Sequence, residues 1–292
     1  MPDPSSRRSD ILLTALAPAI WGSTYLVTTR FLPEGIPFTV ALLRALPAGL
    51  LLLVILRRLP PLALWGKIFV LGALNFTLFW SCLFIAAYRL PGGVAATLGA
   101  MQPLIVLILM RVWMGAPLRP LAVVAGSAGV IGVALLVLTP AATLDPLGLI
   151  AALIGALSMA IGTVLTRTWA LPARPLTVTA WQLVAGGLLL LPIALILDPP
   201  MPQVSATNIM GFVYLGLIGG AVTYFLWFRG IARLDPQTVA PLGLLSPFTA
   251  VILGVVIARE NLSALQSLGM VVVLASVYLG QYAQAPRRMS PA

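Results

Sequence analysis

The residues of this sequence that could do chemistry are aromatic and amide side chains inside long apolar runs. Trp21 and Trp80 lie well inside two runs, and each indole combines an N–H donor with a flat face for a planar or cationic solute. The other residues that could line a solute cavity are Tyr25, Arg44, Asn75, Gln102, Trp181, Gln182, Tyr224 and Ser246. No nucleophile among them has the base partner that activation requires, so we expect solute recognition and no catalytic residue.

Each of these residues also has a purely structural interpretation. A ring can pack in the core, and an amide such as Asn75 or Gln182 can hydrogen-bond across helices, because facing lipid would be costly. Arg44 is the only ionisable group deep within a run, about seven residues and roughly 10 Å of helix rise from its outer end. An intramembrane charge is a functional hypothesis by default, and the planar guanidinium suits a carboxylate. Arg44 could instead reach the outer surface near Glu34.

The titratable residues exclude several kinds of chemistry. The sequence has no histidine and a single cysteine, Cys82. The acids lie at the termini or between apolar runs, at Asp3, Asp10, Glu34, Asp145, Asp198, Asp235 and Glu260. No metal-ligand, P-loop or dinucleotide-binding spacing occurs, so we expect neither a metal nor a cofactor. Proton-coupled carriers place a carboxylate or histidine within the membrane. No carboxylate or histidine lies inside a predicted span of this sequence, which favours a carrier that moves its solute down the solute gradient.

The composition that surrounds these residues is that of an integral membrane protein. The 292-residue chain is 60% hydrophobic and 8% charged, whereas soluble domains carry about 25% charged residues. A helix needs about 20 apolar residues to cross a bilayer. We expect an all-α membrane protein, because strand-like alternation is absent and only helices can then span. The ten predicted spans are 11–31, 36–56, 67–88, 91–111, 120–139, 146–166, 176–197, 208–228, 237–257 and 262–282.

Basic residues are distributed unevenly between the two ends of the predicted spans. With the N-terminus inside, the inner segments hold thirteen Lys and Arg residues, and the outer segments hold only Arg30, Arg89 and Arg259. Cytoplasmic loops carry such an excess, so we expect both termini in the cytoplasm. Topology then explains the net charge of +10. No basic patch with interleaved aromatics indicates a nucleic-acid partner.

A repeat divides the predicted spans into two sets. The stretch RLPGGVAATLGAMQP at 89–103 matches RLDPQTVAPLGLLSP at 233–247 at six of fifteen positions, 144 residues apart. PFTVALLRALPAGLLLL from Pro37 matches PLTVTAWQLVAGGLLLL from Pro175 at eight of seventeen positions. We therefore expect two five-helix units, 11–139 and 146–282. Because five is odd, the second unit must be inverted in the membrane, an architecture typical of secondary transporters with a midplane binding site.

Two prolines end the first pair of repeated stretches inside apolar runs. Pro103 and Pro247 each lie well inside a predicted span, 91–111 and 237–257. Proline frees a backbone carbonyl and bends a helix, so each is either a gating hinge or a plain structural kink. Gln102 and Ser246, which precede them, could satisfy the freed backbone or contact a substrate.

Three stretches resemble the EamA-type branch of the drug/metabolite transporter superfamily. They are PAIWGSTYLVTTRFLP, TVALLRALPAGLLLL, and VAPLGLLSPFTAVILGVVIARENLSALQSLGMVVVLASVYLG, which covers the last two spans. The resemblance extends over nearly the whole chain, and among the members the YddG-like exporters of aromatic amino acids are most similar. It implies ten helices in a five-plus-five inverted repeat, and metabolite export. Glu260 has no counterpart in the first half.

The combined expectation is a carrier that exports amino acids, aromatic ones foremost, with planar drugs as a second class. An Arg-rich, Lys-poor composition is typical of bacteria with high genomic GC, so we expect the bacterial inner membrane. The expected partners are the lipid bilayer and a small-molecule substrate. The oligomeric state stays open, and a monomer is compatible with the sequence. The alternatives are a proton-coupled multidrug exporter, another metabolite carrier, a channel-like pore or a membrane-embedded enzyme.

Overall fold

The computed structural model describes residues 4–115, 120–137, 144–234, 239 and 242–284, and within these ranges every regular element is a helix. The first half contains α1 (Pro4–Gly22), α2 (Thr24–Phe31), α3 (Pro37–Leu56), η1 (Leu62–Leu64), α4 (Trp65–Gly72), η2 (Ala73–Leu78), α5 (Phe79–Arg89), α6 (Gly92–Gly99), α7 (Gln102–Met114) and α8 (Pro120–Val137). The second contains α9 (Pro146–Trp169), α10 (Pro175–Leu197), α11 (Ala206–Val213), η3 (Tyr214–Val222), α12 (Thr223–Arg233), α14 (Leu245–Val256) and α15 (Ala264–Gln284).

Seven continuous helical segments in the described ranges are long and apolar enough to cross a membrane. They are Arg7–Phe31, Pro37–Leu56, Leu62–Arg89, Gly92–Met114, Pro146–Trp169, Pro175–Leu197 and Ala206–Arg233. Shorter apolar helices occupy Val123–Leu135, Leu245–Val256 and Ala264–Gly280, within the other three predicted spans. The end of the span expected at 120–139 and the start of the one at 237–257 lie outside the described residues. The all-helical membrane fold is confirmed, and the count of ten stays a prediction.

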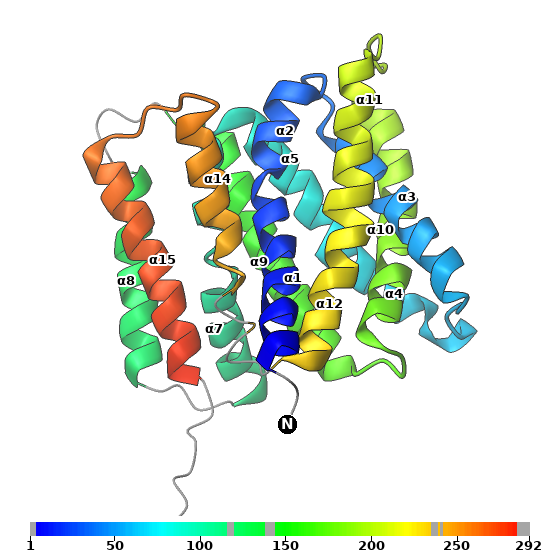
Figure 1. Cartoon of the computed structure of the whole chain (residues 1–292), viewed down its shortest axis with the longest axis horizontal. Helices are drawn as coiled ribbons and strands as arrows, with labels where there is room; N and C mark the ends of the chain where they lie inside the picture. The colour runs from blue at the N-terminus through cyan, green and yellow to red at the C-terminus, as the bar shows by residue number, and fades with distance from the viewer. Residues whose placement is uncertain (1–3, 116–119, 138–143, 235–238, 240–241, 285–292) are drawn as a thin grey trace, which may run out of the picture.

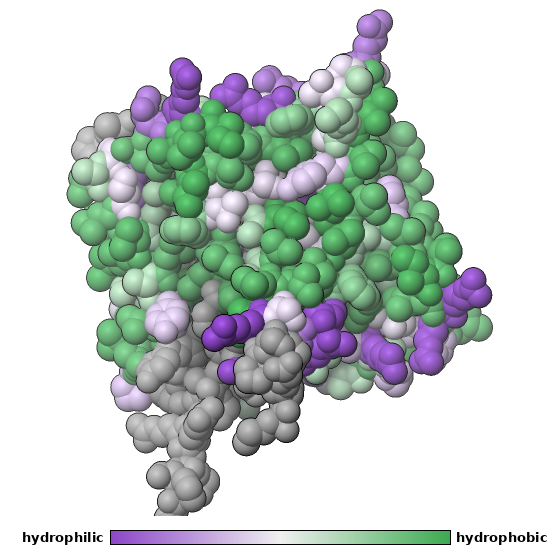
Figure 2. All heavy atoms as spheres, viewed as in Figure 1, coloured by the Kyte–Doolittle hydropathy of each residue, from purple (hydrophilic) through white to green (hydrophobic). Residues whose placement is uncertain are grey.

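The surface has the layering that a bilayer requires. On the face shown in Figure 2, hydrophilic residues gather at the upper and lower ends and hydrophobic residues form the band between them. Many large apolar side chains in this band are exposed, among them Val54, Val130 and Val271, each at least 63%. In Figure 1, α1 begins and α15 ends at the same, lower end of the bundle. An exposed apolar surface of this extent indicates contact with lipid.

Helices α3 and α10 pack closely side by side through glycines, with contacts that repeat between them. A Cβ on Gly49 of α3 would lie 2.8 Å from the backbone nitrogen of Val184, and one on Gly187 of α10 would lie 2.8 Å from Cβ of Leu46. Both Gly187 and Val184 follow their counterparts, Gly49 and Leu46, by 138 residues. Each helix therefore presents the same pair of positions to the other, which is the contact pattern of a two-fold arrangement.

A π-helical turn interrupts one membrane segment in each half. In the first half it is η2 (Ala73–Leu78), and in the second it is η3 (Tyr214–Val222). Their last residues, Leu78 and Val222, are 144 residues apart, the offset already visible in the sequence. Such turns are rare and frequently occur at functional sites. Here they place Asn75 and Gly219 at corresponding positions that face α10 and α3.

The two prolines predicted to bend helices instead stand at helix starts. Helix α6 ends at Gly99 and α7 begins at Gln102, so Pro103 is the second residue of a new helix. Pro247 is the third residue of α14. A proline in the first turn removes no intrahelical hydrogen bond, because those N–H groups have no helical partner. The expected mid-helix bend is therefore replaced by an interruption just before the proline, and the hinge role stays a prediction.

An ion pair joins the two halves at each end of the bundle. Asp10 of α1 pairs with Arg229 and Arg233 of α12, at 2.6 and 3.5 Å between nitrogen and oxygen. Asp145, the N-cap of α9, pairs with Arg89 at 3.0 Å. The Gly148 N–H and then the Arg89 guanidinium lower the pKa of the Asp145 carboxyl. The Asp145 contact thus contributes stability above the usual aspartate pKa, which is lost only in stronger acid.

Candidate solute-binding site

Arg44 of α3 is buried where the two halves of the chain meet, called the seam below, and it contacts residues from three other elements, α2, α5 and η3. Its guanidinium donates to Thr24 Oγ1 at 3.1 Å and to the Gly219 carbonyl at 3.3 Å. Its central carbon lies 4.6 Å from the ring centroid of Trp80, within the range of a cation–π interaction. Its Nε has no hydrogen-bond partner, and no carboxylate of the described residues pairs with the guanidinium. Arg44 is 4% exposed, so it does not reach the outer surface near Glu34.

Trp21 reaches the same π-helical turn from α1. Its Nε1 donates to Thr223 Oγ1 at 2.8 Å and to the Gly219 carbonyl at 3.2 Å. That carbonyl also accepts from Arg44, so one backbone oxygen joins the indole of α1 to the guanidinium of α3. The same carbonyl also accepts from Thr223 Oγ1 at 2.9 Å, so three side chains from α1, α3 and α12 meet at this π-helical turn.

Four aromatic side chains contact one another in series beside Arg44, and we call them the aromatic circuit: Trp21, Tyr224, Phe76 and Trp80. Phe76 lies edge-on to Trp80 at 5.1 Å between centroids and edge-on to Tyr224 at 5.9 Å. Tyr224 lies 5.5 Å from Trp21. Trp80 and Tyr224 are 144 residues apart, so the two halves supply corresponding rings. Trp80 is fully buried, whereas Trp21 and Tyr224 are half-buried and keep part of each ring exposed. The circuit offers flat apolar faces around one cationic group.

The contact between Asn75 and Gln182 corresponds, in the other half, to the contact between Gly219 and Arg44. Asn75 of η2 donates from Nδ2 to Gln182 Oε1 at 2.7 Å and to Thr166 Oγ1 at 3.2 Å. Gln182 corresponds to Arg44 at the 138-residue offset, and Asn75 corresponds to Gly219 at the 144-residue offset. Each long polar side chain of α3 or α10 thus meets the π-helical turn of the other half. The Asn75–Gln182 pair is an interhelical hydrogen bond, one of the two roles expected from the sequence.

Replacement of Gly162 tests how much the hydrogen bonds of Asn75 contribute to stability. A Cβ at Gly162 would overlap the carboxamide of Asn75, and moving that group breaks its bonds to Gln182 and Thr166. We expect Gly162→Ala to lower the free energy of unfolding by about 1–3 kcal/mol, as overpacking does. Gly66→Ala is the matched control, because a Cβ there meets nothing within 4 Å. Thermal unfolding of the purified variants checks this, and equal stability of the two would contradict it.

The other residues expected from the sequence to line the cavity make contacts outside the aromatic circuit. Tyr25 is buried and packs beside Gly92 at the start of α6. Gln102 donates to Thr163 Oγ1 of α9 at 3.2 Å, and Ser246 is half-buried where α14 packs on α1. Trp181 donates to the Arg58 carbonyl at 2.7 Å and packs in a separate core cluster with Ile68 and Leu71. The contacts of Trp181 favour its structural interpretation.

Glu260, the acid without a counterpart in the first half, bonds to the N-terminus of α6. Its carboxylate accepts from the backbone N–H groups of Gly92 at 2.7 Å and Gly93 at 3.4 Å, at the N-terminus of α6. A carboxylate is favoured there by the helix dipole and by the unpaired N–H groups. Only about 10 Å³ of space remains in the adjoining hollow between α2, α6 and α14, near the minimum for one water. Glu260 therefore holds α14 against the start of α6, with little space left at this contact.

Sequence reasoning missed several members of the site. Phe76, Thr24 and Thr223 are ordinary membrane-helix residues by type, and Gly219 acts through its carbonyl. The offset of 144 residues could have found part of the circuit, because it carries Trp80 onto Tyr224 and Asn75 onto Gly219. Nothing in the sequence marks a backbone oxygen as an acceptor for three side chains.

Comparisons with known proteins agree with this fold. The model of the EamA-like transporter family matches residues 8–138 and again 146–280. The chain is 44% identical to Protein PecM of Dickeya dadantii over 91% of its own length and 90% of PecM. It is 29% identical to the uncharacterized inner membrane transporter YedA of Escherichia coli over 89% and 86% of the two chains. One solved crystal structure is 21% identical and matches with a TM-score of 0.66 over 93% of this chain and 97% of the other chain. At this identity the match supports the fold alone. The chain belongs to the EamA-like transporter family and is a multi-pass membrane transporter.

Proposed function

We propose that this transporter exports small planar solutes that carry a carboxylate, aromatic amino acids foremost, across the bacterial inner membrane. One observation carries the proposal: the Arg44 guanidinium has no acidic partner among the described residues and lies over Trp80 within an aromatic circuit built by both halves. A buried cation without a counter-ion is costly, and its retention indicates a function. A substrate carboxylate is the counter-ion that would satisfy it.

The transport mechanism we propose is alternating access between two inverted five-helix halves, 11–139 and 146–282. Three sets of contacts support it: the exchanged glycine contacts of α3 and α10, the paired π-helical turns, and the meeting of Arg44 with Gly219 and of Gln182 with Asn75. Reciprocal contacts of this kind arise when two copies of one unit pack about a two-fold axis. In inverted repeats, the solute binds where the two units meet.

The chemistry of the site favours a zwitterion over a phosphorylated substrate. A guanidinium can hold a carboxylate through two parallel hydrogen bonds, and the aromatic faces of Trp21 and Tyr224 suit a planar side chain. A single arginine is poorly equipped to neutralise the several charges of a nucleotide sugar. Planar drugs, which could stack on the same rings, are the second substrate class.

Counterflow of labelled phenylalanine and tryptophan into vesicles that contain the purified protein tests the proposal. We expect saturable uptake that is accelerated by unlabelled amino acid inside, and reduced by Trp21→Ala or Trp80→Ala. A pore would show no such acceleration, because its two openings need not alternate. Absence of uptake for both amino acids, or unchanged uptake in both variants, would contradict the proposed substrate and site.

The energy source we propose is the substrate gradient itself. No carboxylate of the described residues contacts the aromatic circuit, and Glu260 is engaged at the end of the seam. A proton-coupled multidrug exporter is the competing mechanism, and it needs a titratable relay in the membrane. A pH jump across the same vesicles separates the two. Uphill accumulation of substrate driven by a proton gradient alone would rule out facilitated diffusion.

A further inference from the structure

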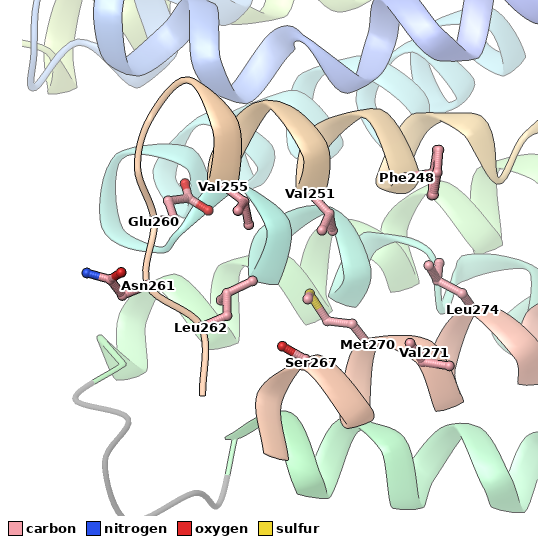
Figure 3. A pocket seen from close by; sticks show the side chains of 10 residues that line it. All are labelled: Phe248, Val251, Val255, Glu260, Asn261, Leu262, Ser267, Met270, Val271 and Leu274. Carbon is pink, nitrogen blue, oxygen red and sulfur yellow. The ribbon is translucent and has the colours of Figure 1, made fainter. Parts of the chain in front are cut away.

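We propose that the groove between α14 and α15 binds a phospholipid with an ethanolamine headgroup, independently of the transported solute. The groove has a volume of about 480 Å³, within the usual range of ligand sites. Figure 3 shows apolar side chains of α14 facing those of α15 across it, with polar groups gathered at one end. The apolar walls are formed by Phe248, Val251, Val255, Met270, Val271 and Leu274.

The groove has the orientation that a membrane lipid requires. Its polar end is formed by Glu260, Asn261 and Ser267, next to the connection that lies at the upper end of the bundle in Figure 1. From Val255 to Phe248 the groove follows seven residues of α14, about 10 Å of helix rise into the hydrophobic band. A headgroup would therefore lie at the membrane interface while an acyl chain follows α14 inward.

The acyl chain alone does not select one lipid over another. Apolar surface gains little when it exchanges one hydrocarbon neighbour for another, so chains of any lipid could fill the groove. An apolar hollow of this kind also stays free of water, because water needs two to four polar partners. Selection among lipids therefore depends on the polar end, where the headgroup contacts the protein.

The charges at the polar end match a zwitterionic headgroup. Glu260 uses part of its carboxylate on the Gly92 and Gly93 N–H groups, and two oxygens offer about four acceptor positions in all. Its remaining positions and the exposed Asn261 and Ser267 can accept from an ammonium group. The exposed Arg259 is next to Glu260 in the sequence, outside the lining of the groove, and supplies a cation at the same end for the phosphate. Phosphatidylglycerol has the phosphate and hydroxyl donors but no cation, so its hydrogen bonds to Glu260 would lack the charge of an ammonium group.

Native mass spectrometry of the purified full-length chain tests the proposal. The protein is incubated with equal amounts of phosphatidylethanolamine and phosphatidylglycerol that carry identical acyl chains, and the retained lipid is counted. We expect about tenfold more phosphatidylethanolamine, the ratio that one additional charge-assisted contact provides. Equal retention of the two lipids, or no retained lipid, would overturn the proposal.

Two neighbouring residues of α14 give a matched pair of variants. Val255 lines the groove, whereas Val256 is 70% exposed and is not part of its lining. Val255→Trp should fill the groove and abolish lipid retention, and Val256→Trp should leave retention unchanged. The double variant Asn261→Ala and Ser267→Ala should keep a lipid but lose the preference for ethanolamine. Equal retention by the two tryptophan variants, or a preserved preference in the double variant, would contradict the proposed site.

Discussion

Replacement of Arg44 by leucine should strongly reduce transport of carboxylate substrates without lowering the stability of the protein. The guanidinium is buried with an unpaired Nε and no acidic partner among the described residues, so its removal relieves a desolvated charge. Apolar replacement of buried charges is often neutral or stabilising. A charge-assisted hydrogen bond contributes about 1.5–3 kcal/mol, so counterflow at low substrate concentration should fall by about 10- to 150-fold.

A second substitution at the same position separates recognition of the carboxylate from retention of charge. Arg44→Lys keeps a positive charge but cannot present the planar fork that meets Thr24 and Gly219 together, so we expect partial transport. Arg111→Leu is the control, because Arg111 is exposed and bonds the Gly115 carbonyl at the end of α7. A large loss of thermal stability in Arg44→Leu would show that Arg44 mainly holds the bundle together.

Glu260→Ala should loosen the contact between α6 and α14 and shift the protein toward a state that is more open at this contact. The substitution removes the carboxylate from the Gly92 and Gly93 N–H groups and so frees the start of α6 from α14. Bonds of this kind contribute about 1.5–3 kcal/mol, enough to change the ratio of open to closed states by roughly 10- to 150-fold. A cysteine at Leu26, beside the nearly filled hollow, should then react faster with a maleimide.

The labelling is best done after Cys82→Ala, which removes the single native cysteine. Glu34→Ala is the control, because this acid is exposed near the end of α2 and is not part of the contact with α6. Glu260→Gln keeps one acceptor for the Gly92 N–H but loses the charge, so it should label at an intermediate rate. Equal rates in Glu260→Ala and in the parent protein would show that Glu260 does not hold α6 against α14.

Sequence alone predicted the residue types of the site better than their partners. Trp21, Trp80, Tyr224 and Arg44 were predicted to line one site, because polar or aromatic groups inside apolar runs are conspicuous, and the structure brings them together. Trp181 looked equivalent by the same criterion, yet it bonds the Arg58 carbonyl in another cluster. Position in an apolar run does not reveal which helix face a residue occupies relative to its neighbours.

The parts that could not be predicted depend on backbone groups distant in sequence. Glu260 bonds to amides 168 and 167 residues earlier, and amides are present at every non-proline position, so no residue type marks them. The π-helical turns also have no sequence signature, since they form where packing displaces one residue. The helix interruptions before Pro103 and Pro247 required knowing where the new helix begins.

Two-sided cysteine labelling tests most directly whether the halves are inverted. Leu62 lies between α3 and α4, and Met201 lies between α10 and α11, at corresponding places in the two halves and both exposed. In Figure 1 these connections lie at opposite ends of the bundle. With an impermeant maleimide on intact cells, we expect a cysteine at Met201 to react, and one at Leu62 to react only after permeabilisation. Reaction of both positions from the same side would contradict the inverted repeat and, with it, alternating access at the seam.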